Sequence, residues 1–371
     1  MIGTALGREL RTDYLYQLTD DTGIFQHSKF GVPDRAKGYT TDDNARALIA
    51  AVMLYKEQRD RRSLDLVCTY LAFVHHAQTD DGHFRNFMNY QRAFIEERGS
   101  EDCFGRCLWA LGFTLSESCL PDSLRNTCRY ALNQALTRVT ELRSPRAVAY
   151  AMVGLSDLLG MSEPLAYAFP SPHVEETVEA EQFLRRDRVQ NIVDELSRRL
   201  QRQFDSNRSA DWNWFEDSIT YGNAMLPLAM LKAARVGGDE TVSRVAKQSL
   251  DFLLSITFSH GDFFKPVGNQ GWLQRNGDAS EFDEQPIEAC ETLLACREAF
   301  TLYGDPKYLT LAQLCYDWFH GRNSIRESLI DEQTGACYDG IHYLGINLNQ
   351  GSENVISYCI AHLAMKGGPL K

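Results

Sequence analysis

The chain repeats one pattern six times: a polar stretch rich in glycine and aromatic residues leads into an unusually apolar helical segment. These junctions are spaced about 60 residues apart, close to the length of one helix pair with its loops. A repeated supersecondary unit constrains the fold more firmly than any single motif, because each unit buries its apolar face against its neighbours. The six junctions are Gly38–Asn44, Glu101–Arg106, Ser144–Arg146, Trp212–Asp217, Phe282–Pro286 and Gln350–Asn354.

Two kinds of helix alternate along the repeat. Amphipathic segments are expected at roughly 4–18, 60–78, 121–141, 183–204, 239–258 and 306–321. Segments that are apolar nearly all round are expected at roughly 43–57, 102–117, 145–159, 219–236, 286–302 and 353–366. A helix that is apolar all round must be buried on every side. The sequence therefore predicts an all-α (α/α)6 toroid of twelve helices, with the apolar helices as the inner ring.

The loops between the helices favour this closed ring over an open helical solenoid or an irregular bundle. The loops before the inner helices reach about 25–40 residues, and long loops in a compact domain are commonly functional. Strand signals are few, so we expect long loops or short β-hairpins, such as one at Gly82–Phe87, over one mouth. The longest interruption, Glu163–Glu181, is expected to be a surface excursion, and residues 1–371 are expected to form a single domain.

Charge and composition exclude several classes of partner. A net charge of −12 without a concentrated basic face argues against nucleic-acid binding. No apolar run is long enough to cross a bilayer, so no membrane association is expected. Residues Met1–Arg11 contain no apolar signal-peptide core, which predicts a cytoplasmic location.

The ten cysteines are scattered, with no CxxC pair and no zinc-type Cys/His spacing. Cys103 and Cys107 lie one helical turn apart, as two metal ligands would. Free cysteine is also a common small core residue, so reduced structural thiols are the favoured interpretation. We expect no metal and no cofactor.

Acidic side chains gather where the inner helices begin. Helix capping explains part of this pattern, and Asp42, Ser144 and Ser352 fit it well. Cleavage of a glycosidic bond explains more, because it needs one carboxylic acid and one carboxylate base or nucleophile. In the adjacent pair Asp42–Asp43, one side chain can cap while the other projects into the ring, and Asp43 is favoured for the second role. The candidate catalytic residues are Asp43, Asp102, Glu216, Asp283 and Glu284.

Aromatic, amide and basic side chains accompany these acids at the same junctions. Aromatic rings offer flat apolar faces to a sugar, while amides and arginines bond its hydroxyl groups. Each aromatic residue taken singly is more often a packing residue, but together they favour a saccharide cleft. The candidate substrate-binding residues are Tyr39, Asn44, Arg46, Arg106, Trp212, Trp214, Tyr221, Asn223, Trp272, Gln285, His342, Tyr343, Gln350 and Glu353.

Histidines offer a rival chemistry, since a sugar epimerase would use imidazoles as acid and base. His83, His260 and His342 lie in stretches expected at the mouth, whereas His75–His76 falls near the end of an outer helix. His342 is the best placed of them. The alternative for each is a structural histidine with satisfied hydrogen bonds.

The architecture and the loop chemistry together resemble the six-hairpin glycosidase superfamily over nearly the whole chain. The segment Thr41–Leu48 is also similar to one in poorly characterised bacterial proteins found beside or fused to glycosyltransferases. Asp42–Asp43 resembles the aspartate pair of (α/α)6 mannan-cleaving glycosidases, although the surrounding residues differ. The superfamily includes hydrolases, sugar epimerases and cyclases, so the fold does not decide the function.

These observations leave three hypotheses. The leading one is a cytoplasmic glycoside hydrolase acting on a short oligosaccharide or glycoconjugate through two carboxylates, with inversion implied by the family resemblance. The second is a sugar epimerase or isomerase that uses histidines. The third is a non-catalytic, saccharide-binding or scaffold toroid that partners a glycosyltransferase.

Overall fold

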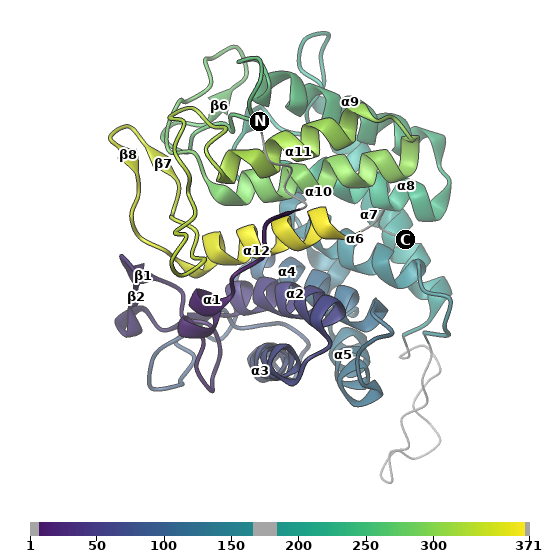
Figure 1. The fold of residues 1–371 in the computed structure, drawn as a ribbon. Helices are drawn as coiled ribbons and strands as arrows, with labels where there is room; N and C mark the ends of the chain where they lie inside the picture. Colours follow the sequence, from purple (N-terminus) through teal and green to yellow (C-terminus); the bar gives the residue numbers. More distant parts are fainter. Residues whose placement is uncertain (1–6, 166–183, 368–371) are drawn as a thin grey trace.

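Six helices form a closed inner ring in the computed structural model, which describes residues 7–165 and 184–367. They are α2 (Thr41–Gln58), α4 (Glu101–Ser116), α6 (Pro145–Leu159), α8 (Met225–Gly237), α10 (Pro286–Tyr303) and α12 (Ser352–Lys366). Each inner helix packs against the next, and α12 packs against α2 (Figure 1). The first and last helices of the ring therefore meet, which confirms the (α/α)6 toroid and excludes an open solenoid.

Five long amphipathic helices surround this ring, and each packs against an inner helix. They are α3 (Arg61–Ala77), α5 (Asp122–Ala135), α7 (Arg186–Asn207), α9 (Glu240–Thr257) and α11 (Lys307–Phe319). The sixth outer element, α1 (Asp13–Gln17), is much shorter than the helix expected at 4–18, of which residues 4–6 lie outside the described part. Residues 8–12 instead lie against a distant loop, where the Arg11 guanidinium donates to the Glu332 carbonyl at 2.9 Å. The excursion expected at 163–181 lies almost wholly outside the described residues.

Small residues bring the inner helices close together, as the sequence pattern requires. A Cβ atom built on Gly112 of α4 would lie only 2.3 Å from the carbonyl oxygen of Gly154 on α6. Gly105 meets the backbone of Ala147 in the same way, at 2.5 Å. These contacts leave no room for a side chain, so glycine at these positions sets the spacing between the two helices.

Within the described residues, the loops between helices contain four two-stranded antiparallel pairs. They are β1–β2 (Ser28–Lys29, Val32–Pro33), β3–β4 (Tyr39–Thr40, Phe87–Met88), β5–β6 (Ser218–Ile219, Leu273–Gln274) and β7–β8 (Ile341–His342, Gly345–Ile346). Figure 1 shows β1–β2 and β7–β8 projecting on the same side of the ring. Helix α8 starts at Met225 rather than near 219, because Ile219 pairs with Leu273 and a turn through Gly222, at φ 59°, follows.

Three further features bear on the composition-based expectations. No helix within residues 7–165 or 184–367 combines the length and apolar character needed to span a bilayer. The ten cysteines are all unpaired, and eight of them are buried, in keeping with structural thiols. Among the described residues, no cluster of histidine, cysteine and acidic side chains is arranged to hold a metal ion.

Candidate active site

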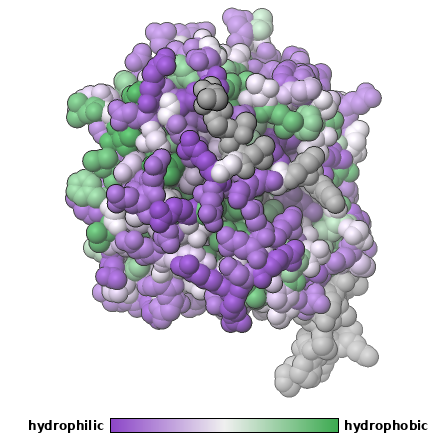
Figure 2. Space-filling view, viewed as in Figure 1, coloured by the Kyte–Doolittle hydropathy of each residue, from purple (hydrophilic) through white to green (hydrophobic). Residues whose placement is uncertain are grey.

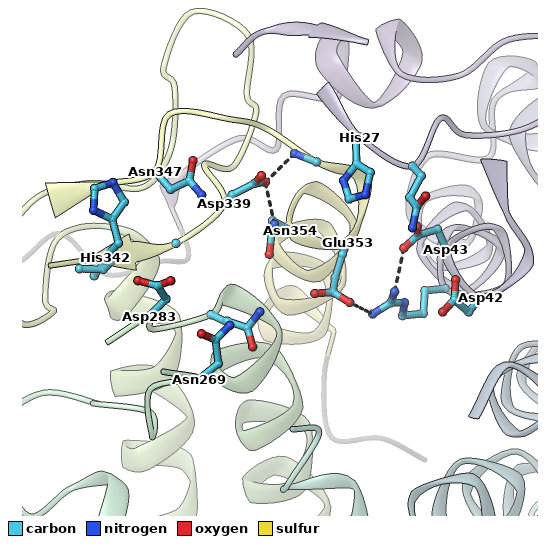
Figure 3. A pocket seen from close by; sticks show the side chains of 16 residues that line it. His27, Asp42, Asp43, Asn269, Asp283, Asp339, His342, Asn347, Glu353 and Asn354 are labelled. Atoms are coloured by element: carbon cyan, nitrogen blue, oxygen red, sulfur yellow. Dashed lines mark hydrogen bonds and ion pairs between the residues drawn. The ribbon is translucent and has the colours of Figure 1, made fainter. Parts of the chain in front are cut away.

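A cavity of about 300 Å³ lies where the N-terminal ends of α2, α10 and α12 meet the β7–β8 hairpin (Figure 3). Its walls come from both halves of the sequence and are mostly polar. Its lining residues are Gln26, His27, Asp42, Asp43, Arg46, Asn269, Asp283, Gln285, Asp339, Gly340, Ile341, His342, Asn347, Gly351, Glu353 and Asn354. A cavity of this size with converging polar groups is typical of a small-molecule site.

The first turn of α2 carries two of the cavity acids. Thr40 precedes the helix in extended conformation, and its hydroxyl donates to Asp43 Oδ2 at 2.6 Å. The other oxygen of Asp43 accepts from the Arg46 guanidinium, one turn further on, at 2.7 Å. Asp42 does not cap the helix as expected, because its carboxylate accepts from Arg106 at 3.1 Å and lines the cavity. Both aspartates therefore belong to the site.

Arg46 connects the first and last helices of the ring. Its guanidinium donates to Asp43 on α2 and, at 2.8 Å, to Glu353 Oε2 on α12. Below it, the Tyr221 hydroxyl donates to the same Glu353 oxygen at 2.8 Å and accepts from Arg106 at 2.9 Å. These contacts hold one wall of the cavity in a single hydrogen-bonded arrangement.

The charges of this network shift the pKa values of its acids in different directions. Burial, together with the Asp42 and Glu353 carboxylates, raises the pKa of Asp43 to about 6, although Arg46 acts in the opposite direction. Burial also acts to raise the pKa of Asp42, but Arg106 and Arg46 outweigh it and hold that pKa below its usual value. Arg46 likewise outweighs burial at Glu353 and lowers its pKa. Neighbouring acids with separated pKa values suit acid–base chemistry.

The opposite wall is built by the start of α10 and the β7–β8 hairpin, and Figure 3 shows Asp283 and His342 there. The Gln270 side chain donates to Asp283 Oδ2 at 3.2 Å. The Leu344 backbone N–H donates to His342 Nδ1 at 3.0 Å, so the neutral imidazole carries its proton on Nε2. In the neutral ring, His342 Nε2 is therefore a hydrogen-bond donor.

A third set of groups comes from the loop before α12. Asp339 Oδ1 accepts from the Gly351 N–H at 2.6 Å and from Asn354 Nδ2 at 2.7 Å (Figure 3). Burial raises the pKa of Asp339. The site thus combines imidazoles, carboxylates and amides around one space, a set that can bind hydroxyl groups and move protons.

Eight of the predicted site residues are brought together here. Six line the cavity: Asp43, Arg46, Asp283, Gln285, His342 and Glu353. Arg106 and Tyr221 lie beneath it and hold the lining acids in place. Tyr343 follows His342 but points outward, with 67% of its surface exposed.

The other predicted residues do not line the cavity, because they are hydrogen-bonded or packed in other parts of the fold. Glu284 is fully buried, accepting from Lys265, Trp318 and Ser324. Asp102 accepts from the Ser144 hydroxyl and Glu216 from Arg146, both away from the cavity. Tyr39, Asn44, Trp212, Trp214, Asn223 and Gln350 are buried, and Trp272 is half-buried in a loop.

Sequence reasoning missed several lining residues, namely His27, Asn269, Asp339, Asn347 and Asn354. His27 belongs to the polar stretch before the first inner helix, and Asp339 to the stretch that contains His342, so both stand in regions already expected at the mouth. His260, by contrast, is exposed and hydrogen-bonded to Ser259, away from the lining. Its neighbourhood therefore does not join the site.

The hairpins beside the cavity carry exposed apolar side chains. Phe30 and Val32 on the β1–β2 hairpin are each more than half exposed, as are Tyr343, Leu344 and Leu348 at the β7–β8 hairpin. Figure 2 shows apolar surface on the left, where Figure 1 places these hairpins. The Phe30 N–H donates to Asn349 at 3.0 Å, which links the two regions.

Comparison with known proteins gives matches in structure only. Neither a known protein family nor a curated protein sequence matches the chain. Among solved structures, the chain is similar to a cellobiose 2-epimerase from Spirochaeta thermophila, with a TM-score of 0.68, 12% identity, and 95% of this chain and 92% of that chain covered. It is similar to a D-mannose isomerase, with a TM-score of 0.65, 11% identity, and coverage of 95% and 94%.

A hydrolase has the same fold. An α-mannanase of family GH76 from Bacteroides thetaiotaomicron matches with a TM-score of 0.59, 10% identity, and coverage of 96% of this chain and 94% of that one. The resemblance of Thr41–Leu48 to glycosyltransferase-associated proteins is not tested by these similarities and stays a prediction. At such identities the likeness establishes the fold alone, and the chain is an (α/α)6 toroid.

Proposed function

We propose that this protein is a carbohydrate-active enzyme that epimerises or isomerises a sugar by moving a proton. The observation that carries the proposal is that two imidazoles, His27 and His342, line the same cavity. Histidine is the side chain whose unperturbed pKa best suits proton transfer near neutral pH. The similarity to an epimerase and an isomerase across nearly the whole of both chains supports the same chemistry. Sugar epimerisation or isomerisation therefore replaces glycoside hydrolysis as the leading hypothesis.

The reaction requires an open-chain sugar with a carbonyl group. A base removes the proton from the carbon beside the carbonyl; the electron pair of that C–H bond forms a C=C bond while the carbonyl π pair moves to the oxygen, giving an enediolate. Return of a proton to the opposite face of the same carbon gives an epimer. Return of a proton to the former carbonyl carbon, with transfer of the C2 hydroxyl proton to the C1 oxygen, gives a ketose isomer. His342 suits the donor role, because its Nε2 carries the proton while Nδ1 accepts from Leu344. We assign the base role to His27, and Arg46 supplies positive charge for the enediolate.

Deuterium exchange tests this proposal directly. Glucose, mannose and cellobiose are incubated with the protein in D2O, and proton NMR follows both the loss of the C2 proton and the appearance of a new epimer or ketose. We expect exchange with at least one sugar, reduced more than about a hundredfold in His27→Asn and in His342→Asn. His260→Asn is the matched control and should exchange at the wild-type rate. Absence of exchange with these three sugars and with their amino-substituted derivatives contradicts the proposal.

A glycoside hydrolase is the second candidate, favoured by one observation. Asp43, with a pKa raised to about 6, and Asp283 line the same cavity on opposite sides of Glu353 (Figure 3). A protonated acid and an ionised base are what glycosidic cleavage needs. Release of reducing sugar from α- and β-linked manno-, gluco- and galacto-oligosaccharides, abolished by Asp43→Asn, would establish it. Sugar binding without product in either assay would instead favour the non-catalytic toroid.

A further inference from the structure

Two cavity carboxylates have no cationic partner in the part of the chain that the structure describes. Asp43 and Glu353 are paired with Arg46, and Asp42 with Arg106. Within residues 7–165 and 184–367, no lysine, arginine or histidine nitrogen lies within 4.0 Å of the carboxylate of Asp283 or Asp339. Two arginines thus serve three acids on one wall, while the remaining two acids are uncompensated. On the side of Asp283 and Asp339 the cavity therefore has acidic groups without an ion-pair partner among these residues.

The same side of the cavity has acceptor atoms without donors. Asp283 Oδ1 and Asn354 Oδ1 are buried and accept no hydrogen bond from the described residues. The orientation of the Asn354 amide is fixed, because its Nδ2 donates to Asp339 and leaves Oδ1 as the free atom. Gln285 Oε1 is a third buried acceptor of this kind among the lining residues. Buried polar groups are normally hydrogen-bonded, so this wall is built for a ligand rich in donors.

The other wall has the opposite character. Arg46 Nε is buried there without an acceptor, although both of its terminal nitrogens are engaged. Figure 3 shows Asp283 and Asn354 on one side of Glu353, and Asp43, with which Arg46 forms an ion pair, on the other. A ligand that satisfies both walls presents donors toward Asp283 and an acceptor oxygen toward Arg46.

We infer that the substrate is an amino sugar whose ammonium group binds against Asp283 and Asn354, an inference that rests on the proposed function. An ammonium group has three donors and no acceptor, which matches a cavity lined by residues with one carboxylate oxygen and two amide oxygens that lack donors. Its positive charge complements the unpaired carboxylates, whereas one hydroxyl group offers only one donor and no charge. Uronic acids and sugar phosphates should bind more weakly than a neutral sugar, because their negative charge would meet two acids without an ion-pair partner.

Binding measurements on the wild-type protein test the inference without requiring turnover. Isothermal titration at about pH 6.5 compares glucose with three glucose derivatives that carry an amino group at C2, C3 or C6, and with glucuronate. We expect at least one amino sugar to bind ten or more times more tightly than glucose, and glucuronate to bind ten or more times more weakly. The inference is overturned if no amino sugar binds more tightly than glucose, or if glucuronate binds as well as glucose does.

A variant places the effect on the proposed wall. Asp283→Asn removes the charge at nearly constant shape, so the preference for the amino sugar should fall to within about threefold of glucose. The control is Asp217→Asn, whose carboxylate is exposed, pairs with Arg275 and does not line the cavity, and which should retain the full preference. Retention of the preference in Asp283→Asn would overturn this assignment.

The exchange assay separates the two proposals. Deuterium exchange without an amino-sugar preference would leave the proposed function standing and overturn the substrate inference. A clear preference for an amino sugar, without exchange on any sugar including the preferred one, would overturn the proposed function and leave the amino-sugar binding standing.

Discussion

Replacing Glu291 with glutamine should abolish a large part of the pH dependence of stability. Glu291 lies on α10 with 2% of its surface exposed, and its Oε1 accepts a hydrogen bond from the Tyr150 hydroxyl at 2.8 Å. Its other carboxylate oxygen has no hydrogen-bond donor among the described residues. Burial, followed by the neighbouring Glu288 carboxylate, raises the pKa of Glu291 from 4.5 to about 8.

The sign of the effect follows from proton counting. Between about pH 4.5 and 8 the folded protein holds a proton on Glu291 that the unfolded chain has released, so the free energy of unfolding falls as the pH rises through this window. At 1.36 kcal/mol per pH unit, the loss between pH 4.5 and pH 7 is about 3 kcal/mol. Glutamine keeps the shape of the protonated acid and releases no proton, so Glu291→Gln should not suffer this loss.

The assay is urea unfolding of both proteins at about pH 4.5, 6, 7 and 8.5, followed by far-ultraviolet circular dichroism. The difference in unfolding free energy between variant and wild type cancels the contributions of other titrating groups. We expect this difference to grow with pH in favour of the variant, by about 3 kcal/mol between pH 4.5 and 7. Glu240→Gln, at an exposed position of α9, is the control and should show no trend. A difference that does not change with pH would refute the reasoning.

Two further changes probe the packing and the buried charges of the ring. Gly112→Ala should lower the unfolding free energy by about 1–3 kcal/mol, because the new methyl group meets the Gly154 backbone. The control is Gly237→Ala, which should be neutral because the nearest atom is 3.8 Å away. Equal urea midpoints for the two variants would contradict the close packing at Gly112. Lys265→Met should cost about 3–5 kcal/mol, because it leaves the fully buried Glu284 without its cation. Lys307→Met, at a side chain 45% exposed, should cost less than about 1 kcal/mol, and a similar loss in both variants would show that the Lys265 pair is no stronger than a surface pair.

The fold could be predicted because it depends on periodicity and on all-round burial. Helices such as α6 are apolar on every side, and only a position inside a ring buries all of them. The boundaries that differ lie where loops make contacts over long distances. The start of α8 is delayed by pairing between residues 218–219 and 273–274, which no local pattern in either segment reveals.

The site was predictable only to the level of which junctions contribute. Asp283 and Glu284 look equivalent in sequence, but Glu284 exchanges backbone hydrogen bonds with Ile341 and its side chain faces the core. Successive side chains of an extended segment point to opposite faces, so the Asp283 side chain lies on the side of the cavity. Trp212 and Trp214 were expected to stack on sugars, yet both pack around Phe252 in the interior. Local sequence does not say which way a loop turns its aromatic residues.

The bridge from Arg46 to Glu353 joins residues 307 positions apart, and this has a consequence for biosynthesis. Arg46, Asp43 and Asp42 are made early in synthesis, but the carboxylate that completes their wall belongs to the final helix of the ring. A nascent chain that has not yet released α12 from the ribosome therefore lacks a finished cavity. Under the proposed function, activity would appear at one step, when the last helix docks beside the first, and a chain shortened before α12 should remain inactive however well its other helices fold.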